Sequence, residues 1–294
     1  MPPKHAIALH GGAGVHPDRD YAQVEDHLGE LVRECEAMLA SGQNSIDVVE
    51  HAVAEMENSG FYVAGRGSAP NDQGVVECDA AIMDGKRIRA GGICAAVDIV
   101  NPIRLARSVL EKTPYALLAG DGARAFAIEQ CMVMVADPAV HYRLPIGVEP
   151  AELLRLDEGL AHGTVGAVAL DRSGGLAAAT STGGLLGKRA GRVGDTPLTG
   201  IGNWADADVA VSCTGIGEAF IYAGGARDVA ARMSYGRETL QDAAAALLDA
   251  VAYHQGDGGL VAIDKRGIVT MPFNSPGMKR ACGGSDIDFF VGIL

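Results

Sequence analysis

Apolar positions along the chain recur at two spacings, and the wider spacing predicts helices. In residues 20–40 the apolar side chains fall every three or four positions, as they do on one face of an α-helix. The same spacing predicts helices over residues 45–57, 218–233 and 240–253. A further helix is expected over residues 101–112, with Asn101 as its cap and proline in its first turn.

Short apolar runs that end in glycine-rich turns predict the strands. Residues 5–9 stop at the glycines of HGGAG, and residues 77–100 read as two strands around the hairpin dipeptide Asp84-Gly85. Further strands are expected over residues 164–184, 208–215 and 259–273.

The order of these elements predicts the fold class. Strands, helices, strands, helices and strands follow one another in blocks, without the regular alternation of a parallel sheet. Blocks of this kind favour an α+β fold with antiparallel sheets stacked face to face and helices outside, a four-layer αββα sandwich. We expect one domain over residues 1–294. Residues 137–163 hold several prolines and no sustained pattern, and they predict an exposed, mobile segment.

Composition and charge limit the classes of molecule that the protein is expected to bind. The chain has 294 residues, 48% of them hydrophobic, and no apolar run approaches the roughly 18 residues of a membrane span. Its net charge is −13, and no basic cluster is longer than a short run such as Lys188-Arg189, which argues against nucleic acid and anionic membranes as partners. The N-terminal apolar run breaks at His10, so no secretory signal is expected and the protein is predicted to be cytoplasmic.

Several segments resemble known functional motifs but lack a residue that the motif requires. The six cysteines lie far apart without a C-x-x-C pair, which predicts reduced core thiols and no disulfide or zinc site. GGLLGKR places Arg189 where a phosphate loop needs serine or threonine. HGGAG resembles a lipase oxyanion loop, but no G-x-S-x-G nucleophile follows. We therefore expect no cofactor for catalysis.

The dipeptide Gly163-Thr164 suggests a nucleophile that the chain creates by cutting itself. A threonine at a chain start can use its own amine as base, and the ordinary pKa of an α-amino group, about 7.7–8.0, lies near neutral pH. Glycine before the threonine leaves room for the hydroxyl to attack the carbonyl of Gly163. An isolated Gly-Thr is more often the start of a strand.

Residues further along the chain shift the balance towards catalysis. Arg192 and Asp195 share one loop and can bind the carboxylate and ammonium of an amino acid, although loop residues of these types are usually a surface ion pair. In SCTGIGE, Thr214 and the amide of Gly215 can stabilise an oxyanion; otherwise the motif is a strand–helix junction. Thr182 is expected across a hairpin from the nucleophile, or is an ordinary strand residue.

Together these motifs resemble the plant-type (type III) L-asparaginase/isoaspartyl aminopeptidase family of N-terminal nucleophile hydrolases. The resemblance covers nearly the whole chain outside residues 137–163. The motifs that carry it are ALHGGAG, AVAEME, ECDAAIMDGKRIRAGGICAA, NPIRLARSVLEKTP, HGTVGAVALD, AATSTGG, GRVGDTPLTGIG, SCTGIGE and MPFNSPGMKRA.

The resemblance implies a specific enzyme. It implies cleavage between Gly163 and Thr164 into an α chain, residues 1–163, and a β chain, residues 164–294, with two αβ units in the assembly. It implies hydrolysis of L-asparagine and β-aspartyl dipeptides. It assigns the nucleophile to Thr164, its support to Thr182, substrate binding to Arg192, Asp195 and Gly217, and the oxyanion to Thr214 and Gly215, which also line the substrate site.

The resemblance also implies a structural sodium ion and shows one departure from the family. Sodium would bind backbone carbonyls in one loop, namely those of Met56, Glu57, Ser59, Tyr62, Ala64 and Arg66. The family's F-N-A-G-x-G reads here as residues 62–67 with Val63 in the asparagine position, so one polar contact near the new amine is missing. Two alternatives stay open: a glycosylasparaginase, which typically has aspartate where this chain has Gly163, and an uncleaved protein that only binds amino acids.

Overall fold

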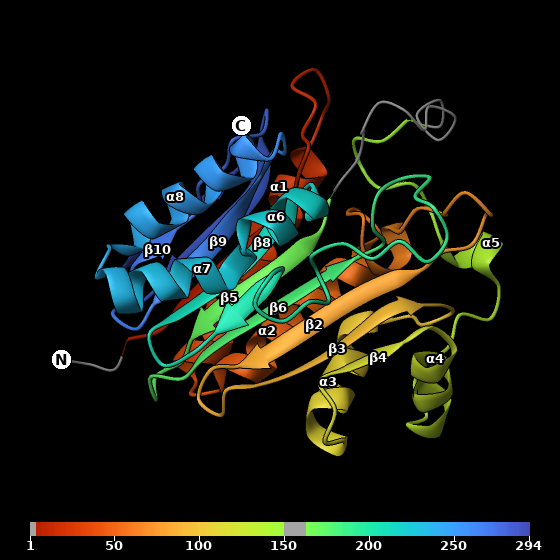
Figure 1. Cartoon of the computed structure of the whole chain (residues 1–294), viewed down its shortest axis with the longest axis horizontal. Coiled ribbons are helices and arrows are strands. Elements are labelled where there is room, and N and C mark those ends of the chain that lie inside the picture. Colours follow the sequence, from red (N-terminus) through yellow and green to blue (C-terminus); the bar gives the residue numbers. More distant parts are fainter. Residues whose placement is uncertain (1–3, 150–162) are drawn as a thin grey trace.

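Figure 1 shows four layers in the computed structural model, which describes residues 4–149 and 163–294. Two β-sheets lie face to face, and helices cover the outer side of each sheet. The predicted αββα sandwich is confirmed. None of the helices in the described ranges is long and apolar enough to cross a membrane.

Within the described residues the larger sheet has eight strands, and its neighbours are antiparallel except for one parallel pair at the edge, β3 and β4. In spatial order the strands are β12 (Ile287–Gly292), β11 (Met278–Gly284), β1 (Ala6–Ala13), β5 (Val165–Leu170), β6 (Leu176–Thr182), β2 (Cys78–Asp84), β3 (Arg89–Ala96) and β4 (Leu117–Ala119). Strand β5, which begins directly after Thr164, and strand β6, which ends at Thr182, are therefore central, with a neighbouring strand on each side.

The smaller sheet has four strands in the described part, ordered β10 (Val269–Thr270), β9 (Gly258–Asp264), β8 (Val209–Gly215) and β7 (Asn203–Ala205). Its outer face packs against α6 (Gly217–Ala223), α7 (Gly225–Ala231) and α8 (Leu240–Tyr253). On the other side of the molecule the larger sheet packs against α1 (Ala22–Ala40), α2 (Ser45–Ser59) and α3 (Pro102–Lys112), with α4 (Gly120–Glu129) at the edge and the short α5 (Pro138–His141) after it.

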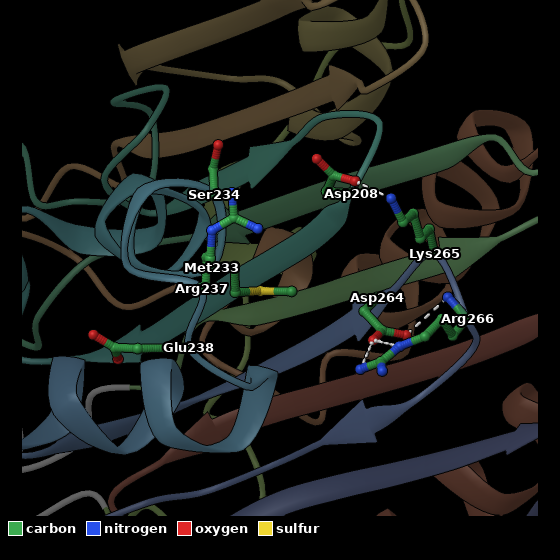
Figure 2. Close-up of a pocket in the computed structure, with 8 residues that line it drawn as sticks. All are labelled: Asp208, Met233, Ser234, Arg237, Glu238, Asp264, Lys265 and Arg266. Carbon is green, nitrogen blue, oxygen red and sulfur yellow. Dashed lines mark hydrogen bonds and ion pairs between the residues drawn. The ribbon is translucent and has the colours of Figure 1, made fainter.

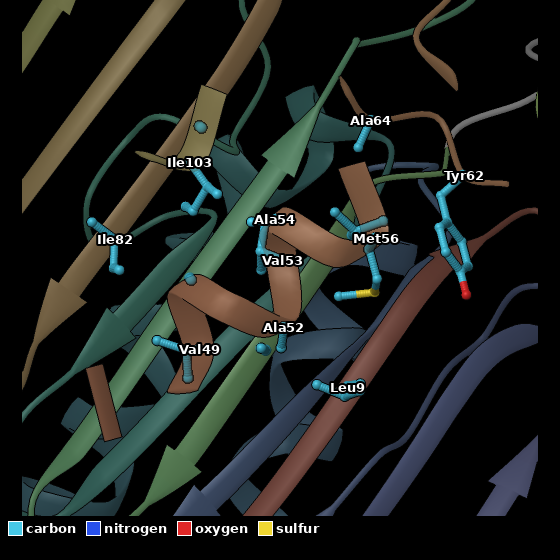
Figure 3. Close-up of a cluster of buried hydrophobic side chains, with 14 of the residues drawn as sticks. Leu9, Val49, Ala52, Val53, Ala54, Met56, Tyr62, Ala64, Ile82 and Ile103 are labelled. Carbon is cyan, nitrogen blue, oxygen red and sulfur yellow. The ribbon is translucent and has the colours of Figure 1, made fainter. Parts of the chain in front are cut away.

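Small side chains explain how α2 lies so close to the larger sheet. Figure 3 shows Ala52, Val53 and Met56 of α2 among the buried side chains of this layer. Four strand positions on the same face are fully buried alanines: Ala167, Ala169, Ala177 and Ala179. The opposite faces of the same strands pack into the core between the two sheets, through Val168, Leu170 and Ala178. Because both faces of β5 and β6 are buried, β5 and the first four residues of β6 are apolar and lack the usual alternation, whereas β6 ends in the buried polar residues Thr180, Ser181 and Thr182.

The helix expected over residues 218–233 is wrong as one continuous helix. Gly224 has a φ of 86° and ends α6 in the left-handed conformation that glycine adopts freely. A second helix, α7, begins directly after it, and residues 232–236 continue as one π-helical turn.

The expected cap of α3 also differs. Asn101 stands before the helix, but its side chain donates to the carbonyl oxygen of Ala54 and to Glu57 Oε2 and makes no cap bond. Glu57 Oε1 instead accepts from the backbone N–H of Ile103 at 3.0 Å. The start of α3 is therefore stabilised by a carboxylate from α2, which sequence spacing does not reveal.

Several short elements and the last two strands were not predicted. Strands β4 and β7 and helices α4 and α5 are short, and β11 and β12 form the edge hairpin at the end of the chain. The predicted mobile segment lies partly outside the described residues, at 150–162. Its described first part contains α5 and a loop bonded back to residues 61 and 66. Of the six cysteines, five are buried, as predicted for core thiols, whereas Cys131 is exposed.

Candidate active site

Thr164 lies at the head of β5, in a cavity between the two sheets. The register pairs Val165 with Ser181, so one step back places Thr164 opposite Thr182. Both threonines are more than nine-tenths buried. The cavity is lined by Thr164, Thr182, Gly184, Leu185, Arg192, Gly194, Asp195, Thr196, Gly215 and Gly217. Seven of the residues predicted for catalysis or binding, including Gly163 at the adjoining bond, thus meet at one place, although they come from four segments.

Gly163 passes through a space that excludes a larger residue. A Cβ built on Gly163 would lie 2.8 Å from Val63 Cγ2. On another side, a Cβ on Gly12 would lie 2.4 Å from Gly163 Cα. Both distances are below ordinary van der Waals contact, so glycine is required at both positions for the backbone before Thr164 to adopt this path.

His10 holds the backbone of Thr164, and the sequence pattern carried no signal for this role beyond its position in HGGAG. His10 Nδ1 lies 2.9 Å from the carbonyl oxygen of Thr164, and Nε2 lies 2.8 Å from Ser212 Oγ. Burial lowers the pKa of His10 to about 3, so the ring is neutral. Because a carbonyl oxygen only accepts, the ring proton is on Nδ1, and Nε2 accepts from Ser212. Thr180 Oγ1, 2.8 Å from Ser212 Oγ, then donates to Ser212.

This directed chain of hydrogen bonds crosses the space between the sheets. All its side chains are fully buried. It also explains a glycine in β5: a Cβ on Gly166 would lie 2.1 Å from Ser212 Oγ and 2.2 Å from His10 Nε2.

Arg192 is oriented by an ion pair that was not predicted. Its Nε and Nη2 donate to the two carboxylate oxygens of Glu218 at 2.9 and 2.6 Å. This hydrogen bond to Arg192 lowers the pKa of Glu218 below its usual value. The partner of Arg192 is therefore Glu218 at the start of α6, not its loop neighbour Asp195, and the fork fixes the guanidinium at the cavity wall.

Asp195 is buried without a full set of partners. Its side chain lies 4% exposed, and Oδ2 has no hydrogen-bond partner within the described residues. Burial raises the pKa of Asp195 to about 7, and nearby Arg192 opposes this rise. Gly217 allows the approach, since a Cβ there would lie 2.9 Å from the N and Oδ1 atoms of Asp195. A buried acceptor at a cavity wall is suited to bind a cationic group.

The residues predicted for the oxyanion differ in their access to the cavity. Gly215 lines it, with a φ of 145°, and a Cβ there would lie 2.2 Å from the carbonyl oxygen of Asp257. Thr214 is fully buried, and its hydroxyl accepts from the backbone N–H of Ala13 at 3.2 Å. The hydroxyl of Thr182 donates towards the carbonyl oxygen of Val63 at 3.4 Å and accepts from Gly184 N–H. Val63 thus contacts β6 through its backbone, independently of its side chain.

In the loop predicted to hold sodium, two carbonyl oxygens lie near Gly67. A Cβ on Gly67 would lie 2.0 Å from the carbonyl oxygen of Tyr62 and 3.1 Å from that of Gly60. Carbonyl oxygens are ligands of hard cations, and of these two only that of Tyr62 belongs to the predicted set. Some of the predicted carbonyls have other bonds: Met56 accepts from Ser59 Oγ, and Ala64 and Arg66 accept backbone N–H groups.

The side chain of Glu57 has a separate role from its backbone. It is fully buried and accepts from Ser181 Oγ at 2.6 Å as well as from Asn101 and Ile103. Burial raises the pKa of Glu57 to about 7. Over the described ranges, no group of three histidine, cysteine or acidic side chains is placed to bind a metal.

A larger surface cavity lies at the other end of β8, and Figure 2 shows its lining. There Lys265 pairs with Asp208 at 2.7 Å and Arg266 pairs with Asp264. These charges satisfy one another at the surface, and the cavity contains no nucleophile beside a base. The cavity at Thr164 is therefore the candidate active site.

Comparison with known proteins finds relatives that match nearly the whole chain. A family profile described as "Asparaginase" matches residues 3–144 and 146–291. The chain is 41% identical to an isoaspartyl peptidase of Salmonella typhimurium over 298 residues, which cover 95% of both chains. It is 41% identical to an isoaspartyl peptidase of Escherichia coli over 95% of this chain and 93% of the relative. A probable isoaspartyl peptidase/L-asparaginase 2 of Arabidopsis thaliana is 39% identical over 96% of both chains.

Proposed function

The chain belongs to the asparaginase family, and we propose that it hydrolyses β-aspartyl (isoaspartyl) dipeptides and L-asparagine with Thr164 as the nucleophile. One observation carries the catalytic assignment. Thr164 lies in the same cavity as Arg192, Asp195 and the glycine turn at Gly215. This supports the assignment, because a hydroxyl nucleophile needs nearby groups that can bind both ends of an α-amino acid.

The first step of the proposal is self-cleavage. Thr164 Oγ attacks the carbonyl carbon of Gly163, the C–N bond breaks, and the nitrogen of Thr164 takes up the proton to become an amine. Water then hydrolyses the resulting ester, which gives a carboxylate on Gly163 and restores the hydroxyl. The close packing of Gly12 and Val63 around Gly163 supports this step, because a tightly held backbone keeps the carbonyl near the hydroxyl.

The second step acts on substrate. The new amine of Thr164 accepts the proton of its own hydroxyl, and Oγ attacks the side-chain carbonyl of the aspartyl group. The amide of Gly215 lies at the cavity wall, where it can stabilise the oxyanion. Ammonia leaves from asparagine, or an amino acid from a dipeptide, and water hydrolyses the aspartyl ester. Asp195 binds the substrate ammonium and Arg192 binds its carboxylate.

Further properties belong to the same proposal. We propose that residues 1–163 and 164–294 remain one folded unit after cleavage, that two such units assemble, and that the protein acts in the cytoplasm. The free cysteines support a reducing compartment. We also propose that sodium binds the carbonyl-lined loop after α2, where it would stabilise the loop without joining the chemistry. Replacing sodium by lithium should then lower the melting temperature without changing the products.

A denaturing gel with mass spectrometry tests the central claim. The protein should separate into two fragments, the smaller beginning TVGAVAL, and should release ammonia from asparagine and leucine from β-Asp-Leu. Thr164→Ala should stay intact and inactive. A wild-type chain that stays intact and releases neither product would contradict the proposal and favour the amino-acid-binding alternative.

A further inference from the structure

Lys279 is a buried cation without a counter-charge. It lies on β11, the strand next to β1, and is 6% exposed. Its Nζ lies 5.2 Å from the ring centroid of Tyr21. Across the described residues, no carboxylate forms an ion pair with it, and burial alone lowers the pKa of Lys279 to about 8. An unpaired buried charge is costly, so a buried lysine either loses its proton or gains stability when an opposite charge binds beside it.

The side chain borders a small cavity on the α1 side of the larger sheet. The lining residues are Gly14, His16, Tyr21, Val63, Pro145, Ile146, Gly147, Val148 and Lys279. Arg19 donates to the carbonyl oxygen of Gly147, which fixes one wall. That wall consists of residues 145–148, which lie close to the end of the first described range, residues 4–149.

The cavity adjoins the bond that is cleaved. Val63 lines the cavity and also packs against Gly163, where a Cβ would lie 2.8 Å from Val63 Cγ2. From the β1 side, a Cβ on Gly11 would lie 3.2 Å from Lys279 Cβ, and the next residue, Gly12, contacts Gly163. Lys279 is therefore close to Gly163 by two routes. One route passes through the side chain of Val63, and the other follows the backbone from Gly11 to Gly12. The carbonyl of Gly163 is the one that becomes a carboxylate in the proposed cleavage.

We propose that this cavity is a carboxylate-binding site in which Lys279 receives the terminal carboxylate of Gly163 after cleavage, an inference that rests on the proposed function. The carboxylate forms an ion pair with the ammonium and stays away from Arg192, which is then free for substrate. A second source has the same chemistry: the carboxylate of the amino acid that leaves a β-aspartyl dipeptide. Asparagine releases ammonia and has no such group, so the two sources can be separated.

Direct titration of Lys279 tests the site itself. The protein is labelled with ¹³C-lysine, and the Lys279 signal is assigned by its loss in Lys279→Arg. In uncleaved Thr164→Ala the pKa should be depressed, and in cleaved wild-type protein it should rise by about 1 to 3 pH units, as expected for a group next to an opposite charge. Sodium acetate, compared with sodium chloride at equal ionic strength, should produce a saturable rise in the Thr164→Ala protein, which does not depend on cleavage.

Kinetics identify the source of the carboxylate. Lys279→Met keeps the volume of the side chain and removes its charge, Lys279→Arg keeps the charge, and Lys265→Met removes a charge at the distant cavity of Figure 2. If the Gly163 carboxylate is the ligand, Lys279→Met should raise KM for asparagine and for β-Asp-Leu alike, by about 3–10-fold (about 0.6–1.4 kcal/mol). If the leaving carboxylate is the ligand, only the KM for β-Asp-Leu should rise. The KM values of Lys279→Arg should lie nearer to those of the wild type, and the KM values of Lys265→Met should equal those of the wild type.

Two results overturn the proposal. One is a Lys279 pKa that neither cleavage nor acetate changes. The other is a fully cleaved Lys279→Met protein with both KM values within twofold of wild type. A wild-type chain that never cleaves contradicts the proposed function instead, and the acetate titration then decides on the carboxylate site alone.

Discussion

His10 Nδ1 donates to the carbonyl oxygen of Thr164 at 2.9 Å, although the two residues lie 154 positions apart. The bond joins β1 to the residue directly before β5, and Ser212 of β8 fixes the other side of the ring. One neutral imidazole therefore couples both sheets to the backbone of the proposed nucleophile. We infer that His10 is a positioning residue.

Replacing His10 should slow self-cleavage and lower the stability of the fold. His10→Ala removes the donor to the carbonyl of Thr164 and the acceptor for the hydroxyl proton of Ser212, which keeps its bond from Thr180; each loss should lower the free energy of unfolding by about 1–3 kcal/mol. We expect self-cleavage to slow by at least about tenfold, followed as fragment yield over time. His10→Asn keeps a donor near Nδ1 and should recover part of the rate. Equal cleavage rates in wild type and His10→Ala would argue against this role.

The raised pKa of Asp195 predicts a change of stability with pH. In the unfolded chain Asp195 releases its proton near its ordinary pKa of 3.8, whereas burial raises the folded pKa to about 7. Between these values the folded state holds a proton that the unfolded state has lost, so the contribution of Asp195 to the free energy of unfolding falls as pH rises from about 4 to about 7.

Urea unfolding of Asp195→Asn at pH 5 and pH 8 checks this prediction. The substitution should stabilise the protein more at pH 8 than at pH 5. Burial raises the pKa of Glu57 to about 7 as well, so the variant should keep a weaker dependence of the same sign. A stability difference between variant and wild type that is the same at both pH values would contradict the assignment.

The same titration should appear in catalysis. An ionised Asp195 is needed to bind the substrate ammonium, so kcat/KM for asparagine should rise between pH 6 and pH 8. Asp195→Asn should raise KM by at least about tenfold, because it removes one charge-assisted contact of about 1.5–3 kcal/mol. A KM that stays near the wild-type value would show that Asp195 does not bind substrate.

Glu218→Gln should weaken substrate binding through Arg192. The variant keeps the shape of the side chain but loses the charge that orients the guanidinium. Glu218 is 45% exposed, so solvent screens the pair and its loss should cost no more than about 1 kcal/mol in stability. We expect KM for asparagine to rise about 3–5-fold with little change in kcat. Glu238→Gln is the matched control, since Glu238 pairs with Arg232 away from the site.

Gly163→Ala should slow self-cleavage because of a single contact. The added methyl group would lie 2.8 Å from Val63 Cγ2 and should displace the carbonyl that is attacked. Val63→Ala removes the contacting methyl groups, so the double variant should cleave faster than Gly163→Ala alone. Fragment yield over time measures both. A double variant as slow as Gly163→Ala would show that Val63 does not set the path of the backbone.

Local sequence was sufficient for much of the fold. The helix predicted over residues 240–253 is α8, and the hairpin of residues 164–184 is β5 and β6. Both follow from side-chain spacing and from glycine turns, which act within a few residues. Glycine also limited the prediction of the helix over residues 218–233. The spacing of apolar residues continues across Gly224, but Gly224 adopts the left-handed conformation and ends α6.

The same contrast holds for the site. The sequence by itself determined which residues have the necessary chemistry: Thr164 after glycine, Thr182 across the hairpin, and Arg192 with Asp195 in one loop. Only the tertiary structure decided that Glu218 orients Arg192, that His10 holds Thr164, that Glu57 caps α3 and that Lys279 is buried without a partner. These roles depend on contacts between segments distant in sequence and on the removal of water around them. Neither the burial of a charge nor the partner it meets is specified by its nearest neighbours along the chain.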